Sequence, residues 1–105
     1  MKIAVPSTGK TLESFISNNL GRSPFIVIYD DQSKKYYALE NPGYQVQDGS
    51  GLKAAELIIR DCADALLTIE IGQKAYSLLM KEHINVHLLN SGGTVKSAIN
   101  KFLKI

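Results

Sequence analysis

The stretch that decides the fold of this chain is residues 48–72, DGSGLKAAELIIRDCADALLTIEIG. It begins with a glycine-bounded loop, and the apolar residues that follow recur at helical spacing and predict one buried helix face: Leu52, Ala55, Ile58, Ile59 and Cys62. The run from Ala65 to Ile71 is almost continuously apolar, which is typical of a parallel strand covered on both faces. The stretch therefore predicts a helix that leads into a strand in the middle of a sheet.

The rest of the chain predicts four more strands and two more helices. The strands are expected at residues 2–5, 25–29, 35–39 and 85–89, and the helices at 73–82 and after Thr94, which can cap the last one. Pro6 is expected to end the first strand, and the polar turn at 30–34 makes the next two strands a hairpin. Residues 7–24 are too irregular for a helix and predict a long loop with at most one helical turn.

The order of these elements fixes the sheet topology. Parallel strands joined by helices cross over with right-handed connections, so the strands at 65–71 and 85–89 should lie on one side of the first strand. The hairpin then occupies the other side. The predicted fold class is α/β, a mixed five-stranded sheet with β-β-β-α-β-α-β-α order, and residues 1–105 are expected to form a single domain because this length supports one core.

The amino-acid composition argues against two classes of binding partner, nucleic acids and membranes. The formal net charge of +2 arises from 12 basic and 10 acidic residues spread along the chain, without the basic run of a nucleic-acid binder. No apolar stretch has the length of a membrane span, and the start MKIAVP is not a signal-peptide core. The expectations are a cytoplasmic protein that binds neither nucleic acid nor membrane, and Cys62 is expected to be a buried, inert thiol.

The loop Gly49-Ser50-Gly51 is the first candidate site. Its glycines allow backbone N–H groups to approach a ligand, and a helix that begins here carries unpaired donors and partial positive charge. A second interpretation is that Asp48 or Ser50 only caps the helix. Ligands of such sheets collect outside the carboxyl ends of parallel strands, where Gly72 and Gly92 also lie.

Other motifs are weaker indications of a functional site. Residues 4–11, ending in Gly9-Lys10-Thr11, match a relaxed phosphate loop, but the residues after Thr11 do not predict the helix that a phosphate site requires. His83 and His87 have metal-ligand spacing only if one helix holds both, whereas the pattern places His83 at a helix end and His87 in a strand. No nucleophile and base form a recognisable catalytic set.

Four motifs together resemble a known family. They are Gly21-Arg22-Ser23-Pro24-Phe25, Asn41-Pro42, Gly49-Ser50-Gly51 followed by Ala54-Ala55-Glu56, and Gly92-Gly93-Thr94-Val95-Lys96-Ser97-Ala98-Ile99. In order and spacing they resemble the dinitrogenase iron-molybdenum cofactor biosynthesis family, the NifX type. The resemblance extends over almost the whole chain. It implies a ribonuclease H-like α/β fold, no catalytic activity, and an accessory or carrier role for iron-molybdenum or related metal-sulfide clusters.

The resemblance also defines where a ligand would bind. Many relatives have histidines where this chain has Asn19 and Asp48, and these replacements favour capture of an anionic cluster or oxyanion over direct metal ligation. No protein metal ligand is therefore expected. The guanidinium of Arg22 would form charge-assisted hydrogen bonds to the anion. The expected cofactor-binding residues are Gly21, Arg22, Gly49, Ser50, Gly51, Gly72 and Gly92.

Three classes of function remain open. The first is a carrier of a metal-sulfide cluster or oxyanion, and the second is a docking module that contacts metallocluster-assembly proteins without a metal of its own. The third and most remote is a nucleotide-binding enzyme, suggested only by Gly9-Lys10-Thr11.

Overall fold

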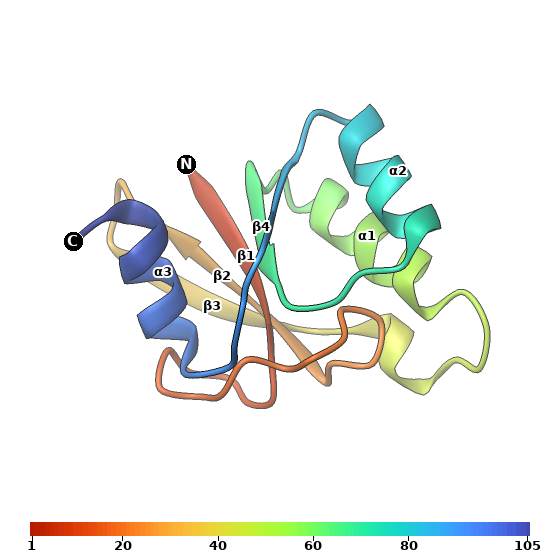
Figure 1. The fold of residues 1–105 in the computed structure, drawn as a ribbon, viewed down its shortest axis with the longest axis horizontal. Helices are drawn as coiled ribbons and strands as arrows, with labels where there is room; N and C mark the ends of the chain where they lie inside the picture. Colours follow the sequence, from red (N-terminus) through yellow and green to blue (C-terminus); the bar gives the residue numbers. More distant parts are fainter.

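The computed structural model describes residues 1–105 as a mixed five-stranded sheet with helices on both faces (Figure 1). The elements follow the order β1 (Lys2–Ser7), β2 (Phe25–Asp30), β3 (Lys35–Glu40), the 3-10 helix η1 (Pro42–Gln45), α1 (Ser50–Arg60), β4 (Ala65–Thr68), α2 (Gln73–Lys81), β5 (Asn85–Leu88) and α3 (Val95–Leu103). The strand order is β3-β2-β1-β4-β5, in which β4 and β5 are parallel to β1, β2 is antiparallel to β1, and β3 is antiparallel to β2. The predicted α/β class, element order and sheet topology are confirmed.

Two strands differ from their predicted lengths by more than one residue. Pro6 does not end β1, because the antiparallel register continues through Pro6 opposite Ile26 and Ser7 opposite Phe25. The central strand β4 ends at Thr68 instead of Ile71. There the Thr68 hydroxyl donates to the Glu70 carbonyl (3.1 Å), and the Glu70 N–H donates to the Asn18 carbonyl (3.0 Å). Residues 69–71 therefore leave the ladder and contact the long loop after β1.

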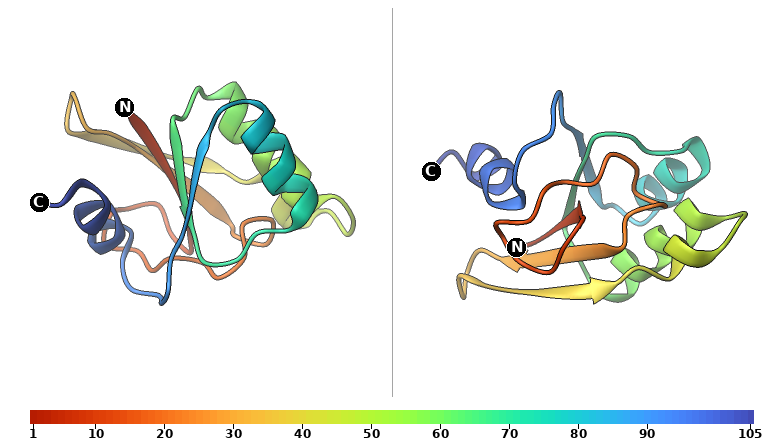
Figure 2. Two further views of the ribbon diagram at one scale, coloured as in Figure 1. Left: turned by 45° about the horizontal axis from the view of Figure 1, so that its top comes forward. Right: turned by 90° about the horizontal axis from the view of Figure 1, so that it is seen from below.

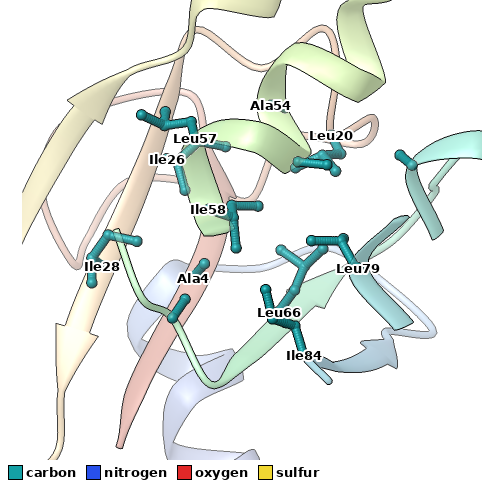
Figure 3. Packing of buried hydrophobic residues seen from close by; sticks show 13 residues of the cluster. Ala4, Leu20, Ile26, Ile28, Ala54, Leu57, Ile58, Leu66, Leu79 and Ile84 are labelled. Carbon is teal, nitrogen blue, oxygen red and sulfur yellow. The ribbon is translucent and has the colours of Figure 1, made fainter. Parts of the chain in front are cut away.

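The sheet separates two hydrophobic cores. α1 and α2 cover one face, and Figure 3 shows Leu20 from the long loop, Ile58 from α1 and Leu79 from α2 directed into that core. α3 covers the other face, where Val95, Ala98 and Ile99 pack on residues of β1, β2 and β4. Figure 2 shows the same division from two further directions. None of the three helices is long and apolar enough to cross a bilayer.

Each of the three α-helices ends with the same type of turn. Cys62, His83 and Lys104 have positive φ angles of 60°, 63° and 61°. In each case the next N–H bonds back five residues, as from Ala63 to the Ile58 carbonyl (3.2 Å). This is the hydrogen bond of a Schellman motif, in which glycine is the usual left-handed residue.

The position of Cys62 in such a turn corrects a prediction. The sequence pattern placed this thiol on the buried face of the helix, but α1 ends at Arg60 and Cys62 is exposed. Helical spacing does not apply beyond the last helical residue. The buried face of α1 consists of Ala54, Ala55, Leu57 and Ile58.

Candidate anion-binding site

The first turn of α1 has unpaired backbone donors. Its N-cap residue is Gly49, which has a φ angle of 74° and no side chain to accept a hydrogen bond. Neither Asp48 nor Ser50 caps the helix, so the capping interpretation is wrong. The first N–H groups of a helix have no partner within the helix, and here no side chain replaces it. The first turn therefore keeps donors for a ligand, at the positive end of the helix dipole.

The first turn of α2 has the same property and faces the same groove. Its N-cap residue is Gly72, and no side-chain hydrogen bond closes it. The groove between the two turns has a volume of about 960 Å³ and is open to solvent. Its only charged lining residue is Lys74. The lining consists of Gly49, Ser50, Gly51, Leu52, Gly72, Gln73, Lys74, Ala75 and Ser77.

Two glycines from other loops support the start of α1 from behind. A side chain at Gly21 would overlap the Ser50 hydroxyl and would place Cβ 2.7 Å from the Gly51 nitrogen. A side chain at Gly43 would overlap the Ser50 carbonyl. Only residues without Cβ allow such an approach, so Gly21 and Gly43 belong to the packing under the site. They do not line the groove.

Asn41 joins these two loops. Its buried side-chain amide donates to the carbonyls of Leu20 (3.0 Å) and Ser23 (2.8 Å), and its oxygen accepts from the Gly43 N–H (3.0 Å). Buried polar groups that are fully hydrogen-bonded specify one arrangement of the chain. The Asn41-Pro42 motif thus holds the loop that contains Gly21 against η1 and α1.

Arg22 has a different position from the one expected. Its guanidinium donates through Nη1 to the Val46 carbonyl (2.5 Å) and through Nη2 to the Gln47 carbonyl (2.7 Å). These carbonyls lie in the segment that leads into α1. Arg22 is exposed and does not line the groove, so its direct contact is with this segment.

Gly92 lies apart from the other predicted site residues. It lines a separate pocket of about 200 Å³ beside α3, together with Ser91, Ser97 and Lys101. The adjacent helix α3 is capped, because the Thr94 hydroxyl accepts a hydrogen bond from the Ser97 N–H (3.1 Å). The predicted Thr94 cap is confirmed. The structure therefore brings together Gly49, Ser50, Gly51 and Gly72, with Gly21 behind them, and leaves Gly92 outside.

The soft-metal ligands of the chain lie away from the groove. No group of three or more histidine, cysteine, aspartate or glutamate side chains is arranged to hold a metal ion. Cys62 follows the C-terminal end of α1, whereas the groove lies at its N-terminal end. His87 lies on β5 and makes an edge-to-face contact with Phe102 of α3 (4.6 Å between ring centroids), while His83 follows α2. The two histidines diverge, as their placement on different elements predicted.

The side chains whose pKa values are shifted also lie away from the groove. Burial and a hydrogen bond to Asp61 raise the pKa of Tyr37, and interactions with the Tyr37 hydroxyl raise the pKa of Lys2. Both residues lie near Asp61, at the far end of α1. The electrostatics of the groove therefore arise from helix termini and Lys74.

The structure also bears on the phosphate-loop pattern. No helix follows Thr11, and the Lys10 ammonium lies over the Phe25 ring (5.4 Å to the centroid). A phosphate loop needs the N-terminus of the following helix to hold the phosphates. Gly9-Lys10-Thr11 lacks this feature.

Fold and site together define a small α/β protein in which a groove between two helix N-termini offers backbone donors. The family model for the dinitrogenase iron-molybdenum cofactor matches residues 1–105, and the chain belongs to this family. Family membership supports an accessory role.

Several solved structures are similar to this chain. The apo form of the orange protein from Desulfovibrio gigas is 29% identical, with a TM-score of 0.92, and the match covers 98% of this chain and 87% of that one. A candidate NifB protein from Thermotoga is also 29% identical, with a TM-score of 0.84 and the same coverage. No curated protein sequence gives a significant match. The family resemblance read from the four motifs is confirmed.

Sequence reasoning missed part of the groove. Lys74, Ala75 and Ser77 line it from the first turns of α2. The sequence signal that could have predicted this part of the groove is Gly72 followed directly by a helix with a lysine in its first turn. The strands that precede the two helices, β3 and β4, run in the same direction, so two glycine-started helices after them predict two donor-bearing ends on the same side of the sheet.

Proposed function

We propose that this protein is a non-catalytic carrier of an anionic metal-sulfide cluster or a related oxyanion or thioanion, held in the groove between α1 and α2. The observation that carries the proposal is that two helix N-termini without side-chain caps open into one groove whose only charged lining residue is Lys74. Each helix contributes about half a positive charge at its N-terminus. An anion in the groove would therefore meet backbone donors from two sides and one ammonium group.

The chemical groups that line the groove determine which kind of cargo it can bind. Thiolate and imidazole ligands are absent from the groove lining, so a bare soft-metal ion has no suitable ligands there. A preassembled cluster that brings its own sulfide ligands needs only hydrogen-bond donors and positive charge on its outside. The groove fits this second kind of cargo, and its volume of about 960 Å³ leaves room for a complex larger than a single oxyanion.

The relatives support the same class of cargo. The family is described by the iron-molybdenum cofactor, and the similar Desulfovibrio gigas structure is an apo form, a term that implies a ligand-bound form of that protein. By analogy, this chain would receive its cluster already assembled and would pass it to a metallocluster-assembly partner.

Arg22 has a positioning role in this proposal. Its hydrogen bonds to the Val46 and Gln47 carbonyls hold the segment before Gly49, and the guanidinium has further N–H donors beyond these two. Because Arg22→Ala removes the two hydrogen bonds that hold this segment, it should weaken cargo binding by about tenfold without changing the spectrum of the cargo that remains bound. A changed spectrum would instead indicate direct contact with the cluster.

The decisive experiment uses a change that favours the fold and opposes the anion. Gly72→Asp places a carboxylate at the N-cap of α2, where aspartate is a preferred cap, so the helix should not be weakened. Thr94→Asp is the matched control, because it adds the same charge at the N-cap of α3 on the other face of the sheet. Each variant is incubated with tetrathiomolybdate and copper, and molybdenum and charge-transfer absorbance are followed through gel filtration.

The wild type and Thr94→Asp should retain the chromophore, and Gly72→Asp should bind at least about tenfold more weakly. Equal retention by all three proteins would contradict the groove as the site. If the wild type acquires no chromophore, the carrier proposal fails and a docking module without its own metal becomes the better description.

A further inference from the structure

The parallel edge of the sheet is open at β5. β5 is the last strand in the order β3-β2-β1-β4-β5, and in Figure 2 it lies between α2 and α3. The N–H groups of Asn85 and Leu89 point toward β4, where they donate to the carbonyls of Asp64 (3.0 Å) and Thr68 (2.8 Å). Because backbone groups alternate along a strand, those of Val86 and Leu88 point away from β4. The outer side of β5 therefore has free donors and acceptors.

Apolar side chains flank this open edge. Leu88 is 63% exposed on β5, and Tyr76 and Met80, one turn apart on the neighbouring helix α2, are 41% and 47% exposed. The small pocket beside α3 lies on the other flank and includes Leu88, Leu89 and Ala98. Exposed edge strands with apolar neighbours are templates for pairing with another chain.

Charge distinguishes the β5 edge from the opposite edge. Residues 71–105, which form α2, β5 and α3, contain one acidic side chain, Glu82, and five exposed lysines: Lys74, Lys81, Lys96, Lys101 and Lys104. The opposite edge strand β3 carries both signs of charge, because it begins at Lys35 and ends at Glu40, and its Tyr37 contacts Asp61. A negatively charged partner would therefore be attracted more strongly to β5 than to β3.

We propose that the outer edge of β5 is a docking surface for an extended, acidic segment of a partner protein, which adds a strand to the sheet. The segment would pair with the backbone of Val86 and Leu88 and place apolar residues against Leu88, Tyr76 and Met80. Its carboxylates would face Lys101 of α3, which lines the same small pocket as Leu88. Strand addition takes affinity from main-chain hydrogen bonds and specificity from alternate side chains. A second copy of this chain is disfavoured as the occupant, because pairing two β5 edges brings lysines together.

The surface is independent of the anion groove. The groove lies between the first turns of α1 and α2, whereas the docking surface involves β5, the Tyr76–Met80 side of α2 and Lys101 of α3. Either proposal can therefore fail without the other.

The test is a titration of the isotope-labelled protein with a short peptide of alternating glutamate and valine, followed by amide chemical shifts. The shifts should concentrate at residues 85–89, with a dissociation constant of roughly 1 mM or tighter. A peptide with lysine in place of glutamate should bind at least about tenfold more weakly, and added salt should reduce the difference. Binding of the glutamate peptide at β3, equal binding of both peptides, or no shift at millimolar concentration would overturn the proposal.

Two variants make the edge assignment specific. Leu88→Pro removes an outward N–H, which a proline on an edge strand tolerates, together with the exposed leucine side chain, and should abolish peptide binding. Lys101→Glu should weaken it about threefold to tenfold, whereas Lys35→Glu on the β3 edge, the matched control, should leave it unchanged. Unchanged binding by Leu88→Pro and Lys101→Glu would refute the surface, as would sedimentation showing a wild-type dimer that Leu88→Pro dissociates.

Discussion

The helices on the two faces of the sheet differ in how their N-termini are capped. On one face α1 and α2 begin after glycines without side-chain caps, and their first turns share a groove. On the other face α3 begins with Thr94, whose hydroxyl accepts from the Ser97 N–H. Side-chain caps satisfy the same donors that would bind an anion. α1 and α2 therefore lack the stabilisation of a side-chain cap, and their first N–H groups remain available for a ligand.

The loop that supports α1 is tightly packed at Gly43, whereas the loop before α3 is open at Gly92. This difference in packing predicts the largest effect on stability. Gly43 lies against the Ser50 carbonyl under the groove, whereas nothing would meet a side chain at Gly92 near α3. Gly43→Ala forces two backbones apart and should lower the free energy of unfolding by about 3 kcal/mol, the upper range of overpacking. Chemical denaturation measures it, and Gly92→Ala is the control with a change below about 0.5 kcal/mol. Equal changes would show that the support under α1 is no tighter than the α3 loop.

Cap substitutions should separate the two faces with a smaller effect. Thr94→Ala removes an existing cap and should cost about 1 kcal/mol of stability. Gly72→Ser adds a neutral cap at α2 and should stabilise the protein by a few tenths of a kcal/mol. Thermal unfolding of both variants checks the pair. A destabilised Gly72→Ser would mean that the α2 donors already have partners.

The smallest effect concerns the opposite end of α1. Cys62 has a left-handed conformation, which costs a non-glycine residue about 1 kcal/mol, so Cys62→Gly should stabilise the protein by up to that amount. Because the thiol is exposed and far from the groove, wild-type Cys62 should react with a thiol reagent in the native state. Blocking it should leave anion binding unchanged. Loss of binding after labelling would contradict the separation of the two ends of α1.

The sequence predicted the sheet and the glycines at the two helix starts of the groove because their signals are local. Apolar periodicity placed α1 and β4, and the right-handed crossover placed β4 and β5 beside β1. Gly49, Gly51 and Gly72 mark helix starts, and the topology brings them to one edge.

Other features depend on contacts that spacing does not encode. The Arg22 guanidinium, which was predicted to bind the anion, donates to carbonyls 24 and 25 residues away. Asn41, for which no role was predicted, donates to the carbonyls of Leu20 and Ser23. Cys62 was misplaced because the sequence does not show where the helix ends. Lys74 was missed because a lysine in a first helical turn has no distinctive pattern.

The most direct test of the central claim is to observe the backbone donors themselves. Amide chemical shifts of the isotope-labelled protein are recorded while tetrathiomolybdate is added. The account predicts large shifts for residues 50–53 and 73–75, the first turns of α1 and α2, and none for residues 95–97, the capped first turn of α3. Shifts centred on Cys62 or His87, or equal shifts at all three helix starts, would contradict the assignment of the groove as the anion site.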